Sequence, residues 1–487
     1  MKNFCRIIML VSAAFLFGCG CEKEGGDDKG QSGKPYIKLG FSEKLVSNRD
    51  GSFEVYVSSN ASWTVEAQAD WLSVSPAEGK GNRNVTVKYV KSEPEEERTG
   101  IIRFAAQGTI PVKLTVKQSS RTFKNPIFGN STLPDPYILK DEDAGGNTVY
   151  YTCKPFGGGV GISQSRKLTQ INGSTNVWKL ASAAEWNHRD LWAPELFHIK
   201  DKNGDYWYIY YAAGNPVKAG MQEGQYGSQR TGVLRASSPM GPYEDMGMIY
   251  TGDQPWHGGP NSQNNIDNTI YAIDMTTFEY DGQRYAVWSG NVNKFENVGG
   301  ISYSGSDQAI YISTMENPWT INHARVEISR ADQSWELKSR KINEGPAMLF
   351  NPDRTKLFCV YSANASWMKD YCLGWLEFDL TGNPTPEDFL NPSNWKKSSG
   401  NVFYRLDGTT KDSGLPGVNG VGHNCFTKSA DGTEDWIVYH EMKFSDGGWG
   451  ERYPFVQKFT WDKDGRPDFG TPVGWQEEVE VPSGEPL

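Results

Sequence analysis

The chain has little cysteine, little histidine and no long apolar run beyond its N-terminus. Its 487 residues include 7 Cys and 6 His, and no basic run occurs among its 49 Lys and Arg, which 59 Asp and Glu outnumber to give a net charge of −10. Nucleic acid is therefore not the expected partner, because its phosphate backbone attracts clustered positive charge. Four Cys beyond the N-terminus have neither the spacing of a disulfide framework nor that of a zinc site: Cys153, Cys359, Cys372 and Cys425.

Aromatic residues and glycine are abundant instead. The chain has 17 Trp, 23 Tyr, 22 Phe and 53 Gly. This composition, with few apolar runs, predicts an all-β protein. At roughly 150 residues per domain, the length predicts two or three domains, or one small domain beside a large one. Aromatic faces also suit sugars, but most of these rings are expected in the core.

The N-terminus predicts a membrane anchor. Residues 1–18 have the basic start and short apolar stretch of a signal peptide, and LFGC at 16–19 resembles a bacterial lipoprotein box. Cleavage before Cys19 and lipidation of its thiol would tether the protein to the outer membrane, on the cell surface or the periplasmic face. Residues 19–34, acidic and Gly-rich, are expected to form a flexible linker.

Residues 35–120 predict a small immunoglobulin-like β-sandwich. Short runs of alternating apolar and polar residues recur between turn clusters about every ten residues. Trp63 and Trp71 lie in such alternating runs, which favours the core over sugar binding. Several stretches resemble the BACON domain, which is common at the N-terminus of surface glycan-degrading proteins in Bacteroidetes: SNASW (59–63), ADWLSVSP (69–76), GKGNRNVTV (79–87) and ERTGIIRF (97–104).

Residues 121–487 contain an internal repeat. Five aromatic segments, each following a turn, recur at intervals that leave room for four strands, and five such units predict a five-bladed β-propeller. The spacing is too long for WD-type blades, which repeat at roughly 40 residues. The segments are NTVYYTCK (147–154), NGDYWYIYYAAG (203–214), DGQRYAVWSGN (281–291), RTKLFCVYSAN (354–364) and GTEDWIVYHEM (432–442).

A polar residue recurs before each of these segments, where another apolar strand begins. A lone Asp in such a place is usually a turn residue. If each of these strands is the innermost of its blade, the polar residues meet at one end of the central channel. We expect them in the same phase of the five repeats: Asp135, Glu195, Asp274, Glu344 and His423.

Carboxylates gathered in one funnel suit the hydrolysis of a glycosidic bond. This reaction needs a proton donor on the leaving oxygen and a carboxylate on the opposite side of the sugar. The donor must hold its proton near neutral pH, so burial or a second carboxylate must raise its pKa. Three carboxylates from different blades could supply a base, an acid and a group that tunes the acid.

Motifs over residues 125–480 resemble those of glycoside hydrolase family 43. The resemblance implies an inverting enzyme with Asp135 as general base, Glu344 as general acid and Asp274 as the residue that tunes pKa and orientation. The motifs are DPYI (135–138), WAPE (192–195), IDMTTFEYDGQRYAVWSG (273–290), NEGP (343–346) and GHN (422–424).

The same resemblance suggests further site residues. His423 matches a channel His that lies near the sugar and, in many members, near a calcium or sodium ion on the propeller axis; the chemistry itself requires no cofactor. Trp192 and Trp288 are candidate platforms for sugar faces, and Arg452 is a candidate substrate contact. Glu195 is expected to be structural or to support the catalytic carboxylates.

Within the family, stretches such as LWAPELF (191–197) and DYCLGWL (370–376) look most like α-L-arabinofuranosidases. The expected substrate is terminal α-L-arabinofuranose on arabinan or arabinoxylan, and the expected oligomeric state is a monomer. A β-xylosidase, an endo-arabinanase, a galactan-active enzyme and an inactive glycan-binding propeller remain alternatives. Retaining fructan hydrolases are excluded because the chain has Arg189-Asp190-Leu191 in place of an RDP motif and no NDPN motif.

Overall fold

A computed structural model describes most of the chain: residues 34–48, 50–92, 97–119, 121–143, 145–222, 226–253, 270–292 and 296–486. The predicted signal peptide, Cys19 and all of the predicted linker except Lys34 lie outside the described residues. No helix among the described residues is long and apolar enough to cross a membrane. The chain forms two compact units. The first holds most residues up to Val116, and the second holds the residues from Lys117 onward together with Leu45–Asn48 and Ser92–Arg98.

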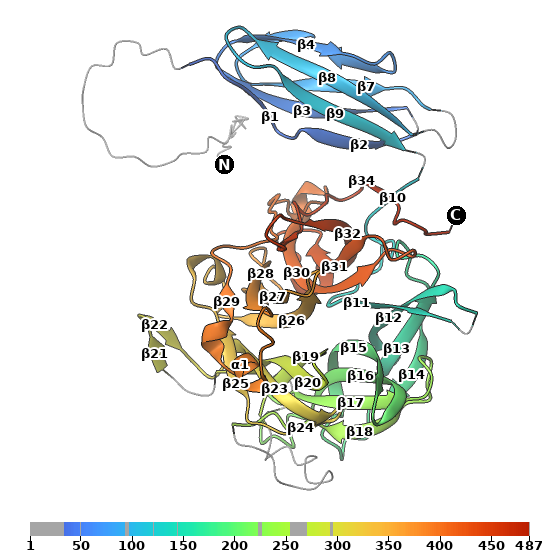
Figure 1. The fold of residues 1–487 in the computed structure, drawn as a ribbon, viewed down its shortest axis with the longest axis vertical. Coiled ribbons are helices and arrows are strands. Elements are labelled where there is room, and N and C mark those ends of the chain that lie inside the picture. Colours follow the sequence, from blue (N-terminus) through green and yellow to red (C-terminus); the bar gives the residue numbers. More distant parts are fainter. Residues whose placement is uncertain are drawn as a thin grey trace, which may run out of the picture. The chain divides into compact units, whose positions relative to one another are not determined.

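The first unit consists of two antiparallel sheets, in the orders β1-β3-β7-β5 and β2-β9-β8-β4-β6 (Figure 1). Its strands are β1 (Ile37–Leu39), β2 (Glu43–Ser47), β3 (Gly51–Ser59), β4 (Ser62–Ala67), β5 (Leu72–Ser75), β6 (Glu78–Lys80), β7 (Arg83–Tyr89), β8 (Arg98–Ala106) and β9 (Val112–Ser119).

Alternation along these strands separates a buried face from a solvent face. In β8, Gly100, Ile102, Phe104 and Ala106 are buried while the residues between them are more exposed, as period-two alternation requires for a sheet with one covered face. Trp63 and Trp71 are only 2% and 6% exposed, and the Trp63 indole N–H donates to the Gly81 carbonyl oxygen at 2.8 Å. Both rings therefore belong to the core and offer no open face to a sugar.

The second unit is also all-β and, besides two sheets of two strands, contains five antiparallel sheets of four or five strands among the described residues, numbered here first to fifth in chain order. The first is β11 (Tyr137–Glu142), β12 (Thr148–Phe156), β13 (Gly159–Ser165) and β14 (Thr175–Lys179), and the second is β15 (Arg189–Asp201), β16 (Gly204–Gly214), β17 (Arg230–Ala236) and β18 (Glu244–Met248). The third is β19 (Ala272–Tyr280), β20 (Gln283–Asn291), β23 (Gln308–Asn317), β24 (Thr320–Ile321) and β25 (Val326–Arg330). The fourth is β26 (Asn343–Phe350), β27 (Lys356–Ala363), β28 (Cys372–Asp379) and β29 (Lys396–Lys397), and the fifth is β30 (Asn419–Lys428), β31 (Asp435–Met442), β32 (Arg452–Trp461) and β33 (Pro467–Asp468).

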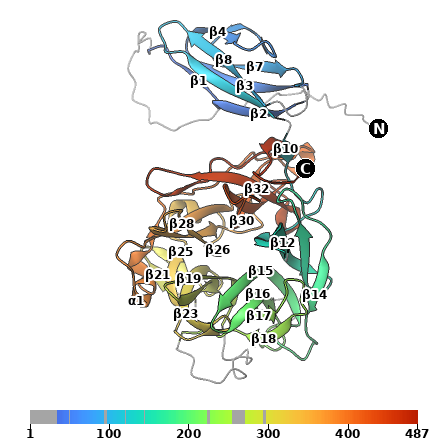
Figure 2. The same ribbon diagram turned by 45° about the vertical axis from the view of Figure 1, so that its right-hand side comes forward.

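The five sheets form a closed ring around a centre (Figures 1 and 2). Their first strands β11, β15, β19, β26 and β30 contact one another in this order, and β30 contacts β11 again. Two strands from opposite ends of the unit, β10 (Thr122–Lys124) and β34 (Glu478–Glu480), pair antiparallel. The remaining regular elements are the hairpin of β21 (Glu296–Val298) and β22 (Ile301–Tyr303), the one-turn helix α1 (Pro386–Phe389) and short 3-10 turns.

The second strand of each sheet is buried on both faces, because neighbouring sheets pack against it from both sides. In β16 all residues from Trp207 to Gly214 are buried, so the run is continuously apolar and aromatic instead of alternating. Its side chains divide between the cluster that includes Trp207, Ile209 and Tyr211 and the one that includes Tyr208 and Tyr210. The aromatic excess of the sequence thus fills the seams between sheets.

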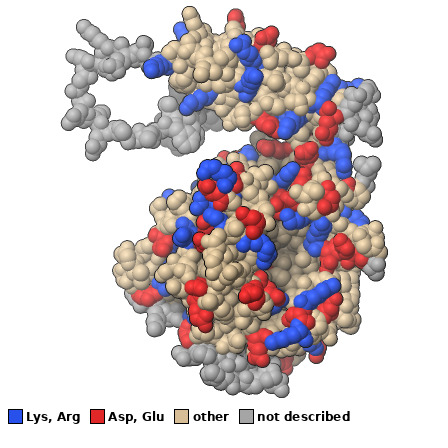
Figure 3. Space-filling model, in the orientation of Figure 1, with Lys and Arg blue, Asp and Glu red and all other residues tan. Residues whose placement is uncertain are grey.

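Charge is dispersed on the molecular surface. On the face drawn in Figure 3, Lys and Arg side chains are interspersed with Asp and Glu side chains, and no continuous basic surface is visible among the described residues on that face.

Candidate active site

Each of the five inner strands has a backbone irregularity at the same place. Asp135, Ala193, Asp274, Gly345 and His423 all have a positive φ, between 38° and 57°. Each lies two residues before a strand residue that pairs with the next strand, and in four sheets the pairing register shifts across it. Such a bulge re-aims side chains, and Asp, His and Gly accept the left-handed conformation more readily than most residues.

These equivalent positions correct one expectation from the sequence. Asp135, Asp274 and His423 do share one phase of the repeat, but Glu344 precedes this position by one residue and Glu195 follows it by two. In the fourth repeat Gly345 occupies the equivalent position, where a Cβ atom would lie 3.1 Å from His423 Nδ1. The acidic side chain of the fourth repeat therefore comes from Glu344, the residue before Gly345.

Six of the seven residues predicted to contact substrate or catalyse its hydrolysis line a single cavity of about 260 Å³. The cavity lies among residues at the start of the inner strands and in the segments that follow the second strands. Its lining comprises Asp135, Trp192, Tyr226, Tyr271, Ile273, Asp274, Gln308, Glu344, Ser366, Trp367, His423, Trp449 and Arg452.

Trp288, the seventh, does not line the cavity, and its predicted sugar contact is wrong for this structure. Its side chain is fully buried in the cluster between the second and third sheets and stacks on Tyr311 with ring centroids 6.1 Å apart. The strand β20 is covered on both faces, so none of its rings is left for a ligand. The sequence pattern placed Trp288 in the right strand but could not assign its face.

Asp135 is held as a charged carboxylate. Arg452 Nη1 donates to its Oδ1 at 2.9 Å, and His423 Nδ1 lies 3.1 Å from the same oxygen. Burial alone would raise the pKa of Asp135, but the positive charge of Arg452, with His423, outweighs burial and lowers the pKa to about 2. Arg452 is therefore a partner of the predicted base.

Glu344 is in the opposite electrostatic situation. Its side chain is 6% exposed, and the hydroxyl of Tyr371 donates to its Oε1 at 2.9 Å. Burial, with the charge of Asp135, raises the pKa of Glu344 to about 7 against the lowering effects of the Tyr371 hydrogen bond and of Arg452. The same cavity thus contains a carboxylate that stays charged and a carboxyl group that holds a proton near neutral pH.

The surroundings of Asp274 combine features of those of Asp135 and Glu344. Burial, with the charges of Glu344 and Asp135, raises its pKa to about 7 against the opposing effect of His423. Its Oδ2 accepts the Gly345 N–H at 3.1 Å and the Ser289 hydroxyl at 3.3 Å. Both hydrogen bonds favour the charged form of Asp274, but they do not offset its burial.

Glu195 does not line the cavity. Its side chain is 5% exposed and its Oε2 has no hydrogen-bond partner among the described residues. Burial raises its pKa well above the usual range, although a hydrogen bond with Thr276 opposes this. Glu195 is therefore an uncharged residue of the packed centre, in keeping with its expected structural role.

A chain of four aromatic rings surrounds part of the cavity. Ring centroids lie 5.5 Å apart between Trp192 and Tyr226, 5.8 Å between Tyr226 and Trp449, and 5.2 Å between Trp449 and Trp367. Tyr226 and Trp449 are 47% and 44% exposed, which places them at the mouth. We call these four residues the aromatic rim.

Sequence reasoning missed three of the four rim residues. Tyr226, Trp367 and Trp449 all lie in the segment that follows the second strand of a sheet, between β16 and β17, β27 and β28, or β31 and β32. The second strand runs antiparallel to the first, so its end returns to the edge where the inner strand begins. That rule, applied to the five aromatic segments, could have directed attention to these loops.

An ion on the axis requires more donors than His423 provides. His423 Nδ1 lies against Asp135, and among the described residues no group of three or more His, Cys, Asp or Glu side chains could hold a metal. The residues present do not fit a protein-ligated cation, and the axial ion stays a prediction.

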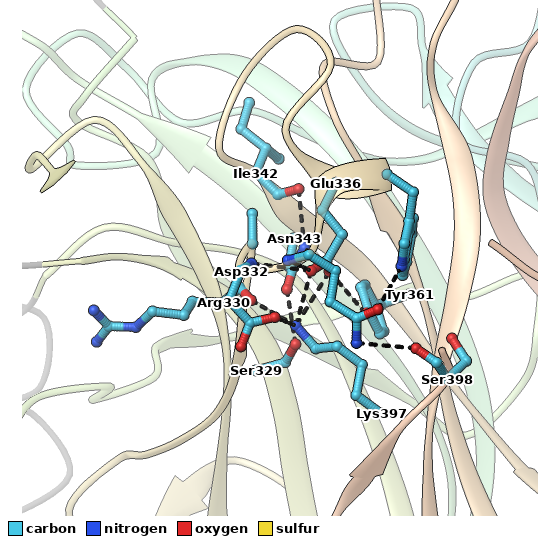
Figure 4. A network of polar contacts seen from close by, with 12 residues as sticks. Ser329, Arg330, Asp332, Glu336, Ile342, Asn343, Tyr361, Lys397 and Ser398 are labelled. Carbon is cyan, nitrogen blue, oxygen red and sulfur yellow. Dashed lines mark hydrogen bonds and ion pairs between the residues drawn. The ribbon is translucent and has the colours of Figure 1, made fainter. Parts of the chain in front are cut away.

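Another buried glutamate, Glu336, does not line the cavity. Glu336, fully buried, forms an ion pair with Lys397 at 3.0 Å and accepts the Tyr361 hydroxyl at 2.8 Å (Figure 4). Its Oε2 also accepts the backbone N–H groups of Asp332 and Gln333. Every acceptor position is thus satisfied, as a buried charge requires.

Comparison with known protein families identifies both parts of the chain. The family described as glycosyl hydrolases family 43 matches residues 123–467, and the domain described as the viral BACON domain matches residues 41–121.

Individual relatives match the same region. An α-L-arabinofuranosidase B of Pyricularia oryzae is 31% identical over 393 residues, covering 77% of this chain and 70% of that protein. An extracellular exo-α-(1→5)-L-arabinofuranosidase of Streptomyces avermitilis is 32% identical over 383 residues, covering 76% and 66%. Among solved structures, an α-L-arabinofuranosidase from Lactobacillus brevis aligns with a TM-score of 0.56 and 27% identity, covering 72% of this chain and 97% of that one.

Proposed function

The chain belongs to glycosyl hydrolase family 43, and from the geometry of its cavity we propose that it is an inverting, exo-acting α-L-arabinofuranosidase. One observation carries the proposal: a single cavity contains Asp135, whose pKa is lowered to about 2 by Arg452 and His423, and Glu344, whose pKa is raised to about 7 by burial. An inverting glycosidase needs this pair, a base for water and an acid for the leaving oxygen. The names of the relatives supply the expected sugar.

The fold supports the proposal. Five sheets whose inner strands form a closed ring support the proposal of a five-bladed propeller with the cavity at one end of its axis. The two antiparallel sheets of the first unit support the proposal of an immunoglobulin-like sandwich.

The chemistry requires no cofactor. Asp135 removes a proton from a water molecule as the water oxygen bonds to the anomeric carbon on one face of the sugar. The bond from that carbon to the leaving oxygen breaks on the other face, and its electron pair takes the proton of Glu344. Asp274, which accepts the N–H of the residue after Glu344, holds the acid in place, while burial and the charge of Asp135 keep the pKa of Glu344 high. The anomeric configuration inverts because no sugar–enzyme bond forms.

The aromatic rim favours exo action. The first sheet, which carries Asp135, lies between the second and fifth sheets, and its own turn at this edge is only Gly157-Gly158. Tyr226 of the second sheet and Trp449 of the fifth meet across this gap. They close the cavity on the side of the base, so a sugar bound there is the end of its chain. The cavity of about 260 Å³ is also below the roughly 300–1,000 Å³ usual for ligand pockets, which suits one terminal sugar.

The test is a comparison of purified protein on four substrates: an aryl α-L-arabinofuranoside, an aryl β-xyloside, linear arabinan and arabinoxylan. We expect arabinose as the sole early product, released from the first, third and fourth. Release of longer oligosaccharides would overturn exo action, and turnover of the xyloside alone would favour the β-xylosidase alternative.

Proton NMR of the first-formed sugar tests the mechanism. We expect the inverted anomer, and Asp135→Asn should reduce turnover by about 10³-fold or more while ligand binding survives. A retained anomer would overturn the inverting assignment, and undiminished turnover in the variant would overturn the role of the base.

We further propose, from the LFGC motif alone, that Cys19 anchors the protein to the outer membrane. Expression of the whole chain with a radiolabelled fatty acid should label the protein, and Cys19→Ala should abolish both label and membrane retention. An unlabelled whole chain would overturn the anchor.

A further inference from the structure

Tyr371 hydrogen-bonds to the carboxyl group of Glu344, as does Ser366, which lines the cavity. Tyr371 lies in the segment between β27 and β28, is fully buried and donates to Glu344 Oε1 at 2.9 Å. It does not line the cavity, so it approaches the acid from behind. The carbonyl oxygen of a protonated carboxyl group is its better acceptor, so the hydrogen bond from Tyr371 to Oε1 favours the acid proton on Oε2.

The Tyr371 ring has almost no freedom to move. A Cβ atom at residue 422 would lie 2.3 Å from its Cε1 atom, so the ring fits against β30 only because that residue is Gly422. The ring also stacks on His440, which is paired with Gly422 in the sheet, with planes 4° apart and centroids 5.5 Å apart. The hydroxyl is therefore pre-organised by packing.

His440 connects this ring to the base. It is fully buried, and its Nδ1 accepts the backbone N–H of Asp135 at 3.3 Å. Burial and the charge of Arg452 hold the pKa of His440 well below its usual range, so it remains a neutral acceptor. A continuous series of contacts thus joins the acid to the base: Glu344 bonds to Tyr371, Tyr371 stacks on His440, and His440 bonds to the backbone of Asp135.

A second hydroxyl sets the direction of the Tyr371 hydrogen bond. Ser362 Oγ accepts the backbone N–H of His423 at 2.8 Å, which leaves its own hydrogen for the Tyr371 oxygen. The Tyr371 hydrogen then points to Glu344. Burial and the charge of Glu344 raise the pKa of Tyr371 well above its usual range, so this hydrogen stays on the phenol throughout the reaction.

We propose that Tyr371 is a positioning residue for the acid step: it holds Oε1 of Glu344 so that the proton on Oε2 faces the leaving oxygen. The proposal rests on the assignment of Glu344 as the general acid. During the reaction the Oε2–H bond breaks, the proton joins the leaving oxygen with the electron pair of the glycosidic bond, and the carboxylate that remains still accepts from Tyr371.

The experiment compares Tyr371→Phe with Tyr361→Phe, a matched control. Tyr361 is equally buried and its hydroxyl donates to a glutamate, but that glutamate is Glu336, outside the cavity. Each variant is assayed on a 4-nitrophenyl arabinofuranoside, whose leaving phenolate needs little protonation, and on arabinobiose, whose leaving alkoxide needs a full proton.

We expect Tyr371→Phe to lower kcat on arabinobiose by about 10-fold or more and on the nitrophenyl substrate by about 3-fold or less, with KM nearly unchanged. The basic limb of its pH profile should move to higher pH, since a hydrogen bond that favours charged Glu344 is lost. Tyr361→Phe should show neither effect. Equal losses on both substrates, an unmoved pH limb or the same pattern in Tyr361→Phe would each overturn the proposal.

Two further variants keep the test decisive. In a Glu344→Gln background, adding Tyr371→Phe should cause no further loss on the nitrophenyl substrate; an additional loss would mean that Tyr371 acts elsewhere. If Tyr371→Phe does not fold, Gly422→Ala displaces the ring but keeps the hydroxyl, and the same substrate-dependent loss is expected; equal losses on the two substrates would overturn the proposal.

Wild-type turnover separates this proposal from the proposed sugar specificity. If wild type hydrolyses neither arabinoside, the arabinofuranosidase assignment fails, and the same variants are compared on a nitrophenyl xyloside and xylobiose. A substrate-dependent loss there supports the role of Tyr371, and equal losses overturn it.

Discussion

Two buried glutamates eight residues apart, Glu336 and Glu344, have opposite surroundings. Glu336 is 0% and Glu344 6% exposed, so burial hardly distinguishes them. Glu336 has Lys397 at 3.0 Å, whereas the cation nearest the chemistry, Arg452, lies against Asp135 instead of Glu344. Burial makes a proton donor only where no counter-charge accompanies it. Within the cavity the same difference separates Asp135, which has the cation Arg452 beside it, from Glu344, which has none in contact among the described residues.

The largest expected effect comes from exchanging each carboxylate for an amide. Glu344→Gln removes the proton donor and should lower kcat on arabinobiose by about 10³-fold or more. Glu336→Gln should stay within about 10-fold of wild type when assayed well below its unfolding temperature. Parallel steady-state assays on arabinobiose check this, and comparable losses in the two variants would refute the contrast.

The free energy of unfolding should fall in Glu336→Gln, the variant in which activity is largely kept. Glu336→Gln leaves Lys397, whose side chain is 13% exposed, with the exposed Asp332 as its remaining carboxylate partner, and breaking a buried ion pair costs up to about 3–5 kcal/mol. Denaturant unfolding at pH 7 measures this loss. The double variant Glu336→Gln/Lys397→Met should recover part of it, because no uncompensated charge remains. If Glu336→Gln unfolds like wild type, the ion pair in Figure 4 contributes nothing measurable.

The two glutamates show how far the sequence alone could predict the site. Asp135, Asp274 and Glu344 could be found because the repeat places polar residues where inner strands begin. The sequence could not reveal that Glu344 lies one residue before the equivalent position of the other repeats. That offset depends on which residue of the bulge takes the positive φ, and here it is Gly345. Glu336 and Lys397 gave no signal, because their pairing depends on a contact across 61 residues.

The fold was more predictable than the ligand surface. The all-β class and two-part organisation follow from alternation, turn spacing and the aromatic repeat, which are local. The orientation of a ring within a doubly covered strand is not local: Trp288 is fully buried, whereas Trp449, in a loop without a repeat signature, reaches the cavity. The N-terminal anchor lies outside the described residues and stays a prediction.

Glu344 should also cost stability at high pH. Its pKa rises from 4.5 to about 7 on folding, so the folded state binds this proton more tightly than the unfolded state. The stability that it contributes is complete below about pH 4.5 and is lost as pH rises through about 7. Glu344→Gln, which cannot ionise, should therefore be more stable than wild type by about 3 kcal/mol at pH 8 and nearly equal to it at pH 4. Unfolding curves at the two pH values test this, and a gain that does not depend on pH would contradict it.

The smallest effect that we predict concerns Gly345, the residue that follows the acid. Its φ is +57°, and an added Cβ atom would lie 3.1 Å from His423 Nδ1, which itself lies 3.1 Å from Asp135 Oδ1. Gly345→Ala should lower stability by about 1–2 kcal/mol through backbone strain and lower kcat by about 10-fold through displaced His423. Gly282 is the matched control, because its φ is +76° and nothing lies within 4 Å of its Cβ position. Gly282→Ala should therefore show a similar loss of stability with unchanged kcat, and a loss of activity there would mean that strain alone, without contact in the cavity, slows the reaction.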